Sequence, residues 1–154
     1  MTRPSRILVV EDGREYVEGF ARLAVVRGLE ATFVRASDSA EARAALAKET
    51  PDTVFLDVVF DRTPEENLAG DLDALVVRSG GDRTRAVAHL ATQQGFYVLD
   101  ALADALAGIR VVVAYDFTGE EKRLEALRAR VPGLRGLPDG ASLGTALEEL
   151  LRSP

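Results

Sequence analysis

Residues 52–59, Asp52-Thr-Val-Phe-Leu-Asp57-Val-Val59, form a short run of β-branched and aromatic residues that contains an aspartate at position 57. An earlier run, Arg6-Ile-Leu-Val-Val-Glu11-Asp12, has the same character and closes on two acids. Such runs are typical of buried parallel strands. Because the carboxyl ends of parallel strands meet at one edge, where open α/β sheets bind ligands, we expect Asp57, Glu11 and Asp12 to converge in one crevice.

Carboxylates gathered in this way repel one another unless a cation joins them. Mg²⁺ suits such a site, since it takes a few carboxylate or carbonyl oxygens and keeps several waters. A carboxylate beside Mg²⁺ can accept a phosphoryl group, because that transfer depends mainly on positioning and on neutralising charge. The acids after these two runs therefore predict a magnesium-dependent phosphoryl chemistry.

The apolar pattern of the whole chain switches repeatedly between short β-rich runs and helical periodicity. Strands are predicted at 6–11, 31–36, 53–58, 110–115 and 134–137, with helices between them. This alternation predicts an α/β fold, a flavodoxin-like doubly wound five-stranded parallel sheet of order 2-1-3-4-5. At 154 residues the chain fits one domain, 1–154.

Three segments of the first half resemble the receiver domain of response regulators. They are Ile7-Leu-Val-Val-Glu-Asp12, the stretch from Val34 to Ala45, and Pro51-Asp-Thr-Val-Phe-Leu-Asp57. The resemblance implies phosphorylation at Asp57 and Mg²⁺ held by Glu11, Asp12, Asp57 and the backbone carbonyl of Val59. It also implies a sensor histidine kinase or a phosphotransfer protein as partner, and no enzymatic activity as the main function.

Several residues depart from the receiver pattern. Receivers usually end the fourth strand with a small hydroxyl residue and the fifth with Lys-Pro, whereas we expect Tyr115 and Leu137 at these switch positions. Losing the lysine removes a charged hydrogen bond of about 1.5–3 kcal/mol, or at least about tenfold in stability of the phosphorylated state. Arg62 and Arg83 are candidates for a substitute cation.

Residues 61–94 intervene before Gly95-Phe-Tyr-Val-Leu-Asp-Ala-Leu102, the segment most similar to the third receiver helix. Thr63-Pro64-Glu65-Glu66 has the form of a capping box and predicts a helix carrying an apolar stripe that includes Leu75. Gly80-Gly81 ends that stripe, and a second helix is predicted from Asp82. We expect this insertion to be a helical hairpin on the ligand-binding face and to bind a downstream protein.

Composition excludes several other functions. The absence of cysteine excludes disulfides and thiolate metal sites. The net charge of −6 argues against nucleic-acid binding, and no apolar run approaches the length that spans a bilayer, so we expect a cytoplasmic protein without a membrane segment. His89, the single histidine, fits a surface or packing role.

Three functions remain open at this point. The first is an atypical stand-alone receiver in two-component signal transduction, phosphorylated on Asp57 and acting through protein–protein interaction. The second is a pseudo-receiver, an interaction module that works without phosphate. The third is a Mg²⁺-dependent phosphohydrolase, which would need a second acid at position 59, where Val59 stands. A homodimer is also possible.

Overall fold

The computed structural model describes residues 3–153, so residues 1, 2 and 154 of the expected domain lie outside it. The sheet has five parallel strands in the order β2-β1-β3-β4-β5, which confirms the predicted topology. The strands are β1 Ser5–Val10, β2 Ala31–Ala36, β3 Thr53–Leu56, β4 Arg110–Val113 and β5 Leu134–Arg135. Three of them are shorter than expected, because the chain turns into loops after Leu56, Val113 and Arg135.

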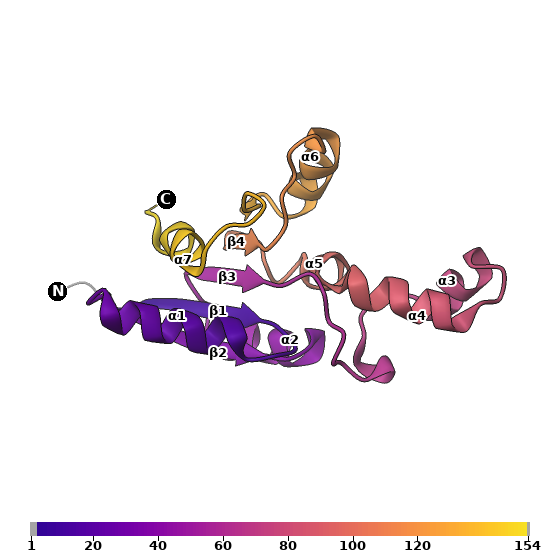
Figure 1. Cartoon of the computed structure of the whole chain (residues 1–154), viewed down its shortest axis with the longest axis horizontal. Helices are drawn as coiled ribbons and strands as arrows, with labels where there is room; N and C mark the ends of the chain where they lie inside the picture. The colour runs from indigo at the N-terminus through magenta and orange to yellow at the C-terminus, as the bar shows by residue number, and fades with distance from the viewer. Residues whose placement is uncertain (1–2, 154) are drawn as a thin grey trace.

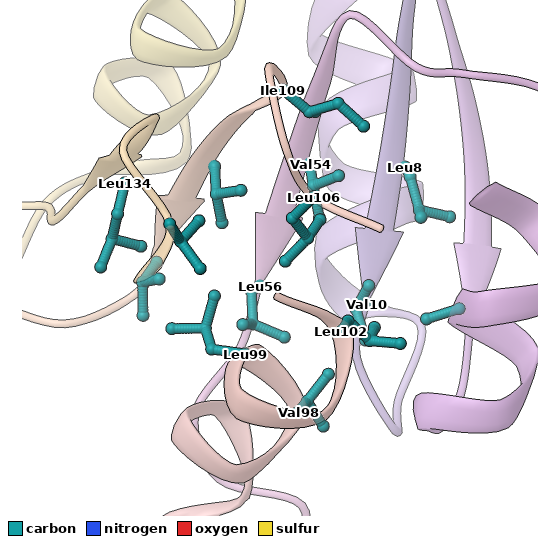
Figure 2. Close-up of a cluster of buried hydrophobic side chains, with 14 of the residues drawn as sticks. Leu8, Val10, Val54, Leu56, Val98, Leu99, Leu102, Leu106, Ile109 and Leu134 are labelled. Atoms are coloured by element: carbon teal, nitrogen blue, oxygen red, sulfur yellow. The ribbon is translucent and has the colours of Figure 1, made fainter. Parts of the chain in front are cut away.

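Helices cover both faces of the sheet (Figure 1). They are α1 Glu15–Val26, α2 Ser39–Lys48, α3 Leu72–Arg78, α4 Arg83–Thr92, α5 Gln94–Leu102, α6 Glu121–Arg130 and α7 Leu143–Leu151, with a 3-10 turn η1 at Glu65–Asn67. One face packs against α1 and α7 around Phe20, Phe55 and Leu147. The other face packs mainly against α2 and α5, where Leu56, Leu99 and Leu102 are fully buried (Figure 2).

The two cores follow from the alternation of side chains along each strand. Leu56 and Val113 belong to the α2/α5 core, whereas their neighbours Phe55 and Val112 belong to the α1/α7 core. Because side chains of successive strand residues point to opposite faces, both faces of the central strands are apolar, as a sheet covered on both sides requires.

The segment from 61 to 94 forms a helical hairpin beyond the C-terminal edge of the sheet (Figure 1). Its helices pack against each other through Leu75, Ala86 and Leu90. The expected helix from Pro64 is wrong: only the η1 turn forms there, and α3 begins at Leu72 after Gly70, whose φ is 113°. The predicted start of the second helix of the hairpin is right, since the Asp82 side chain accepts a hydrogen bond from Arg85 N–H and caps α4.

The hairpin and the sheet join at one tight junction. Helices α4 and α5 are separated only by Gln93 and run nearly in line in Figure 1. The side chain of Gln94, which is 1% exposed, accepts from Ala69 N–H at 2.6 Å and donates to the carbonyls of Ala69 and Leu90. This amide therefore joins the loop before α3 to the junction of α4 and α5.

Within residues 3–153, no helix is both long and apolar enough to cross a membrane.

Candidate functional site

Asp57 stands immediately after β3, at the C-terminal edge of the sheet. Its N–H still donates to the carbonyl of Val10 at 3.0 Å, which anchors the residue beside β1. Oδ1 of Asp57 accepts a hydrogen bond from Val58 N–H at 2.9 Å. Oδ2 of Asp57 has no hydrogen-bond partner among the described residues, and this oxygen is not fully buried. This oxygen is therefore open to solvent or to a ligand.

Asp12 follows β1 on the neighbouring strand, and its charge acts on Asp57. Oδ2 of Asp12 accepts from the backbone N–H of Arg62 at 2.6 Å, so the loop after β3 folds back over the loop after β1. Its other oxygen makes no hydrogen bond within the part of the chain that the structure describes. Each of the two aspartates thus has one oxygen held by the backbone and one without a protein partner.

Glu11 has a role that differs from the expected metal ligand. Its carboxylate is buried, and its two oxygens accept from the N–H groups of Tyr16 at 3.1 Å and Val17 at 2.7 Å. These are orphan donors in the first turn of α1, which a carboxylate satisfies and whose partial positive charge it balances. Glu11 therefore positions α1 beside the site, and within residues 3–153 it does not form a three-acid metal cluster with Asp12 and Asp57.

The pKa of Asp57 is raised from 3.8 to about 6. Burial is the main cause, the hydrogen bond from Val58 opposes it, and the charges of Asp12 and Glu11 raise it further. The pKa of the nearby Tyr16 is also raised, chiefly by burial and then by the charge of Asp57. The carboxylate of Asp57 therefore sits in an environment that favours any added positive charge.

The donors present fit Mg²⁺, with one carboxylate fewer than the sequence predicted. No group of three His, Cys, Asp or Glu side chains close enough to hold a metal occurs within residues 3–153. Two carboxylates remain, Asp12 and Asp57, together with the carbonyl of Val59, a residue that is 44% exposed. Such a set suits Mg²⁺, which is usually held by one or two carboxylates and otherwise keeps water.

The residue that follows β4 beside Asp57 is Ala114, one position before the expected Tyr115. Leu56 pairs with Val113, and Ala114 N–H donates to the carbonyl of Leu56 at 2.9 Å. Ala114 packs with the α1/α7 core, on the face that Asp57 shares by alternation, whereas Tyr115 packs with the opposite core. The position facing Asp57 therefore carries a methyl group and no hydroxyl.

Tyr115 instead belongs to a cluster between α5 and α6. Its hydroxyl donates to Glu120 at 2.6 Å and accepts from Arg123 at 3.2 Å, and the bond to Glu120 raises the pKa of Tyr115. The guanidinium of Arg123 lies 4.1 Å from the centre of the Phe96 ring and also bonds the side chain of Gln93. This cluster links the α4/α5 junction to α6 and turns Tyr115 away from Asp57.

Leu137 is buried in the α1/α7 core, with 7% of its surface exposed. Its N–H donates to the carbonyl of Tyr115 at 3.0 Å, which joins the loop after β5 to the end of β4. A cavity of about 410 Å³ opens beside it and is also lined by Tyr16, Ala114 and Pro138. The two positions where receivers have an ammonium and a hydroxyl carry apolar side chains here, Leu137 and Ala114.

The two candidate substitute cations lie in different places. Arg62 stands over the β1–α1 loop, where its guanidinium bonds Glu15 at 2.7 Å and lowers the pKa of that carboxylate to about 2. It also lies beside Asp12. Arg83 pairs with Glu65 inside the hairpin. The structure thus brings Arg62, but not Arg83, to the acids of the site.

Sequence reasoning missed two positioning residues. A Cβ at Gly95 would lie 2.4 Å from the Asp57 carbonyl oxygen, and Gly95 N–H donates to Val58 at 2.9 Å. Only glycine lets the start of α5 approach the loop after β3 so closely. Arg35 on β2 bonds the carbonyls of Asp12 and Gly13 and so holds the β1–α1 loop. For Gly95 the sequence offers one signal, a glycine near the start of a predicted helix, whereas nothing in the sequence marks Arg35 as a positioning residue.

Comparison with known proteins places this geometry in a known fold. No protein-family model and no curated protein matches the sequence. Among solved structures, a Francisella response regulator receiver domain is 13% identical, with a TM-score of 0.58 over 95% of this chain and 93% of that one. The receiver domain of NtrX from Brucella abortus is 20% identical, with a TM-score of 0.56 over 94% and 97%.

A complex of CheX and CheY with beryllofluoride and magnesium from Borrelia burgdorferi is a third similar structure. It is 14% identical, with a TM-score of 0.59 over 97% of this chain and 88% of that one. At these identities the likeness concerns the fold. The resemblance to CheY-like receiver domains is thereby confirmed for the fold of almost the whole chain.

Proposed function

We propose that this chain is an atypical receiver domain that accepts a phosphoryl group on Asp57 and transmits the signal by binding another protein. The observation that carries the proposal is the second oxygen of Asp57, which has no protein partner among the described residues and stands at the edge where the fold binds ligands. The receiver fold and the retained aspartates at positions 12 and 57 support it.

In the proposed reaction, Oδ2 of Asp57 attacks the phosphorus of a phosphohistidine or of an acyl phosphate. A P–O bond to the carboxylate forms as the bond to the leaving nitrogen or oxygen breaks. With a pKa of about 6, most of Asp57 is ionised near neutral pH and can act as the nucleophile. Asp12, Asp57 and the Val59 carbonyl would hold Mg²⁺, which when bound neutralises charge on the transferring group.

Of the two candidate substitute cations, Arg62 is the one that lies beside the acids after β1 and could act on the phosphorylated state. Its backbone N–H holds Asp12, and its guanidinium is already fixed by Glu15 at the rim of the site. It would supply a charge on the opposite side of Asp57 from the one where Leu137 replaces the receiver lysine. A contact between the Arg62 guanidinium and phosphate would have to compete with its ion pair to Glu15, and this competition would weaken the contact.

Ala114 and Leu137 favour a second candidate, a pseudo-receiver that binds its partner without phosphate. Both positions lack a group that could bond phosphoryl oxygens. In either case the hairpin 61–94 is the proposed partner surface, because the receiver fold does not require it and it projects from the edge that carries Asp57 (Figure 1).

Incubation with acetyl phosphate and Mg²⁺, followed by intact-mass measurement, tests the first candidate. The wild type should gain the mass of one phosphoryl group, and Asp57→Asn should gain none. Asp61→Asn is the matched control, since it removes a neighbouring exposed carboxylate and should leave labelling intact. Absence of label in the wild type, under conditions that label an ordinary receiver, would leave the phosphate-independent module as the function.

A further inference from the structure

Strand β2 is an open edge of the sheet. Within residues 3–153 it pairs only with β1, through the register Ser5–Ala31 to Val10–Ala36. Natural sheets usually protect such an edge with lysine, proline or a bulge. The single charge on β2, Arg35, is turned inward to the carbonyls of Asp12 and Gly13. The backbone groups on the outer side of β2 are therefore available to another strand.

Exposed apolar side chains gather beside this edge. Of the seven large hydrophobic residues exposed within the described chain, three lie here: Val25 at 81%, Leu29 at 40% and Val34 at 54%. They come from the end of α1, the following turn and β2 itself, which lie side by side in Figure 1. Such a concentration marks an interaction surface better than isolated exposed residues do.

Hollows flank β2 on both faces of the sheet. One of about 450 Å³ lies between α1 and β2 and includes Ala21, Val25 and Phe33. The other, of about 130 Å³, includes Val34 and Ala45 on the α2 side. Since side chains alternate along a strand, a strand added to β2 would direct successive residues toward these two hollows in turn.

We propose that the partner on this edge is a second copy of the chain, joined by antiparallel pairing of β2 with β2. A two-fold axis perpendicular to the sheet would keep each face continuous and bring the two α1 helices together in antiparallel orientation. Such an interface is formed by the same patch on both copies and must be complementary to itself. The charges along α1 meet this requirement.

The stripe of α1 beside the edge contains Arg14, Glu18, Ala21 and Val25. Acids stand in the first turn of α1, where Glu18 pairs with Arg14 of the same helix at 3.0 Å. Arg22 stands in the second half of α1 and has no ion-pair partner among the described residues. In the antiparallel arrangement Glu18 of each copy approaches Arg22 of the other. Ala21 near the middle of the stripe allows the helices to approach to a contact distance of about 8–10 Å.

Sedimentation velocity over a wide concentration range tests this dimer. We expect the wild type to be a concentration-dependent dimer and Val34→Lys to raise its dissociation constant at least about tenfold, because lysine on an edge opposes strand pairing. Val77→Lys on α3 is the matched control, since Val77 is 78% exposed and lies away from β2. Circular dichroism and thermal melting verify that each variant is folded.

A charge exchange tests the arrangement of the helices. Glu18→Arg and Arg22→Glu should each weaken the dimer by bringing like charges together, and the double variant should restore it. A wild type that stays monomeric overturns the proposal, as does a dimer that Val34→Lys leaves intact. Failure of the double variant to recover would overturn the antiparallel pairing. Asp57 takes no part, so these results are independent of phosphorylation.

Discussion

Asp57 should destabilise the folded protein at neutral pH when no cation is bound, and Asp57→Asn should relieve that cost. The folded-state pKa of about 6 stands about two units above the ordinary 3.8. At about 1.4 kcal/mol for each unit, the ionised carboxylate costs the fold about 3 kcal/mol. Asparagine is nearly the same size and keeps an oxygen that accepts from Val58, so the substitution isolates the charge.

The pH dependence of this cost has a definite sign. Below the unfolded-state pKa of 3.8, Asp57 is protonated in both states and contributes nothing. As pH rises from there to about 6, the folded state holds the proton more tightly than the unfolded state, so the free energy of unfolding falls. The advantage of Asp57→Asn should therefore grow from near zero at about pH 4 to its full value of about 3 kcal/mol near pH 7.

Urea unfolding of the two proteins at several pH values, in the presence of a chelator, measures this difference directly. Asp61→Asn serves as control and should change stability by less than about 0.5 kcal/mol at every pH, because Asp61 is exposed. Added Mg²⁺ should stabilise the wild type and not Asp57→Asn. A variant that is no more stable than the wild type at neutral pH, or an advantage that does not vary with pH, would refute the reasoning.

Further outcomes follow from the neighbouring residues. In a protein that takes up label, Leu137→Lys combined with Ala114→Thr should slow loss of the phosphoryl group by at least about tenfold relative to the wild type, measured as decay of the labelled mass. Gly95→Ala should lower the free energy of unfolding by about 1–3 kcal/mol in thermal melting, because its Cβ would lie 2.4 Å from the Asp57 carbonyl oxygen. Glu11→Gln should cost about 1–2 kcal/mol in urea unfolding at neutral pH, since glutamine leaves one N–H at the start of α1 without its acceptor.

Local signals predicted the fold and part of the hairpin. Apolar runs and helical stripes were enough for the five-stranded order, and Asp82 marked the start of α4 correctly. The capping-box pattern at Thr63 failed, because the backbone is already extended at Leu68 and only one 3-10 turn forms. Its apolar residues follow helical spacing from Leu72 onward, so the stripe was right and its start was not.

The one-residue difference at Tyr115 has a simple geometric cause. Moving one residue along a strand turns the side chain to the other face of the sheet. The composition of Arg110-Val-Val-Val-Ala-Tyr115 does not say where the ladder ends, and both Ala114 and Tyr115 follow the apolar run. Pairing of Val113 with Leu56 decides that Ala114 lies beside Asp57.

The sequence by itself determined which elements form and which edge of the sheet carries the acids, because hydrophobic period and strand order are local or topological properties. It could not determine how each acid is used. Glu11 binds the start of α1, while Asp12 and Asp57 each keep an oxygen without a protein partner in residues 3–153. Arg62 lies beside Asp12, whereas Arg83 pairs with Glu65 in the hairpin. Those roles depend on hydrogen bonds between segments distant in the chain, which only the packed tertiary structure brings within reach.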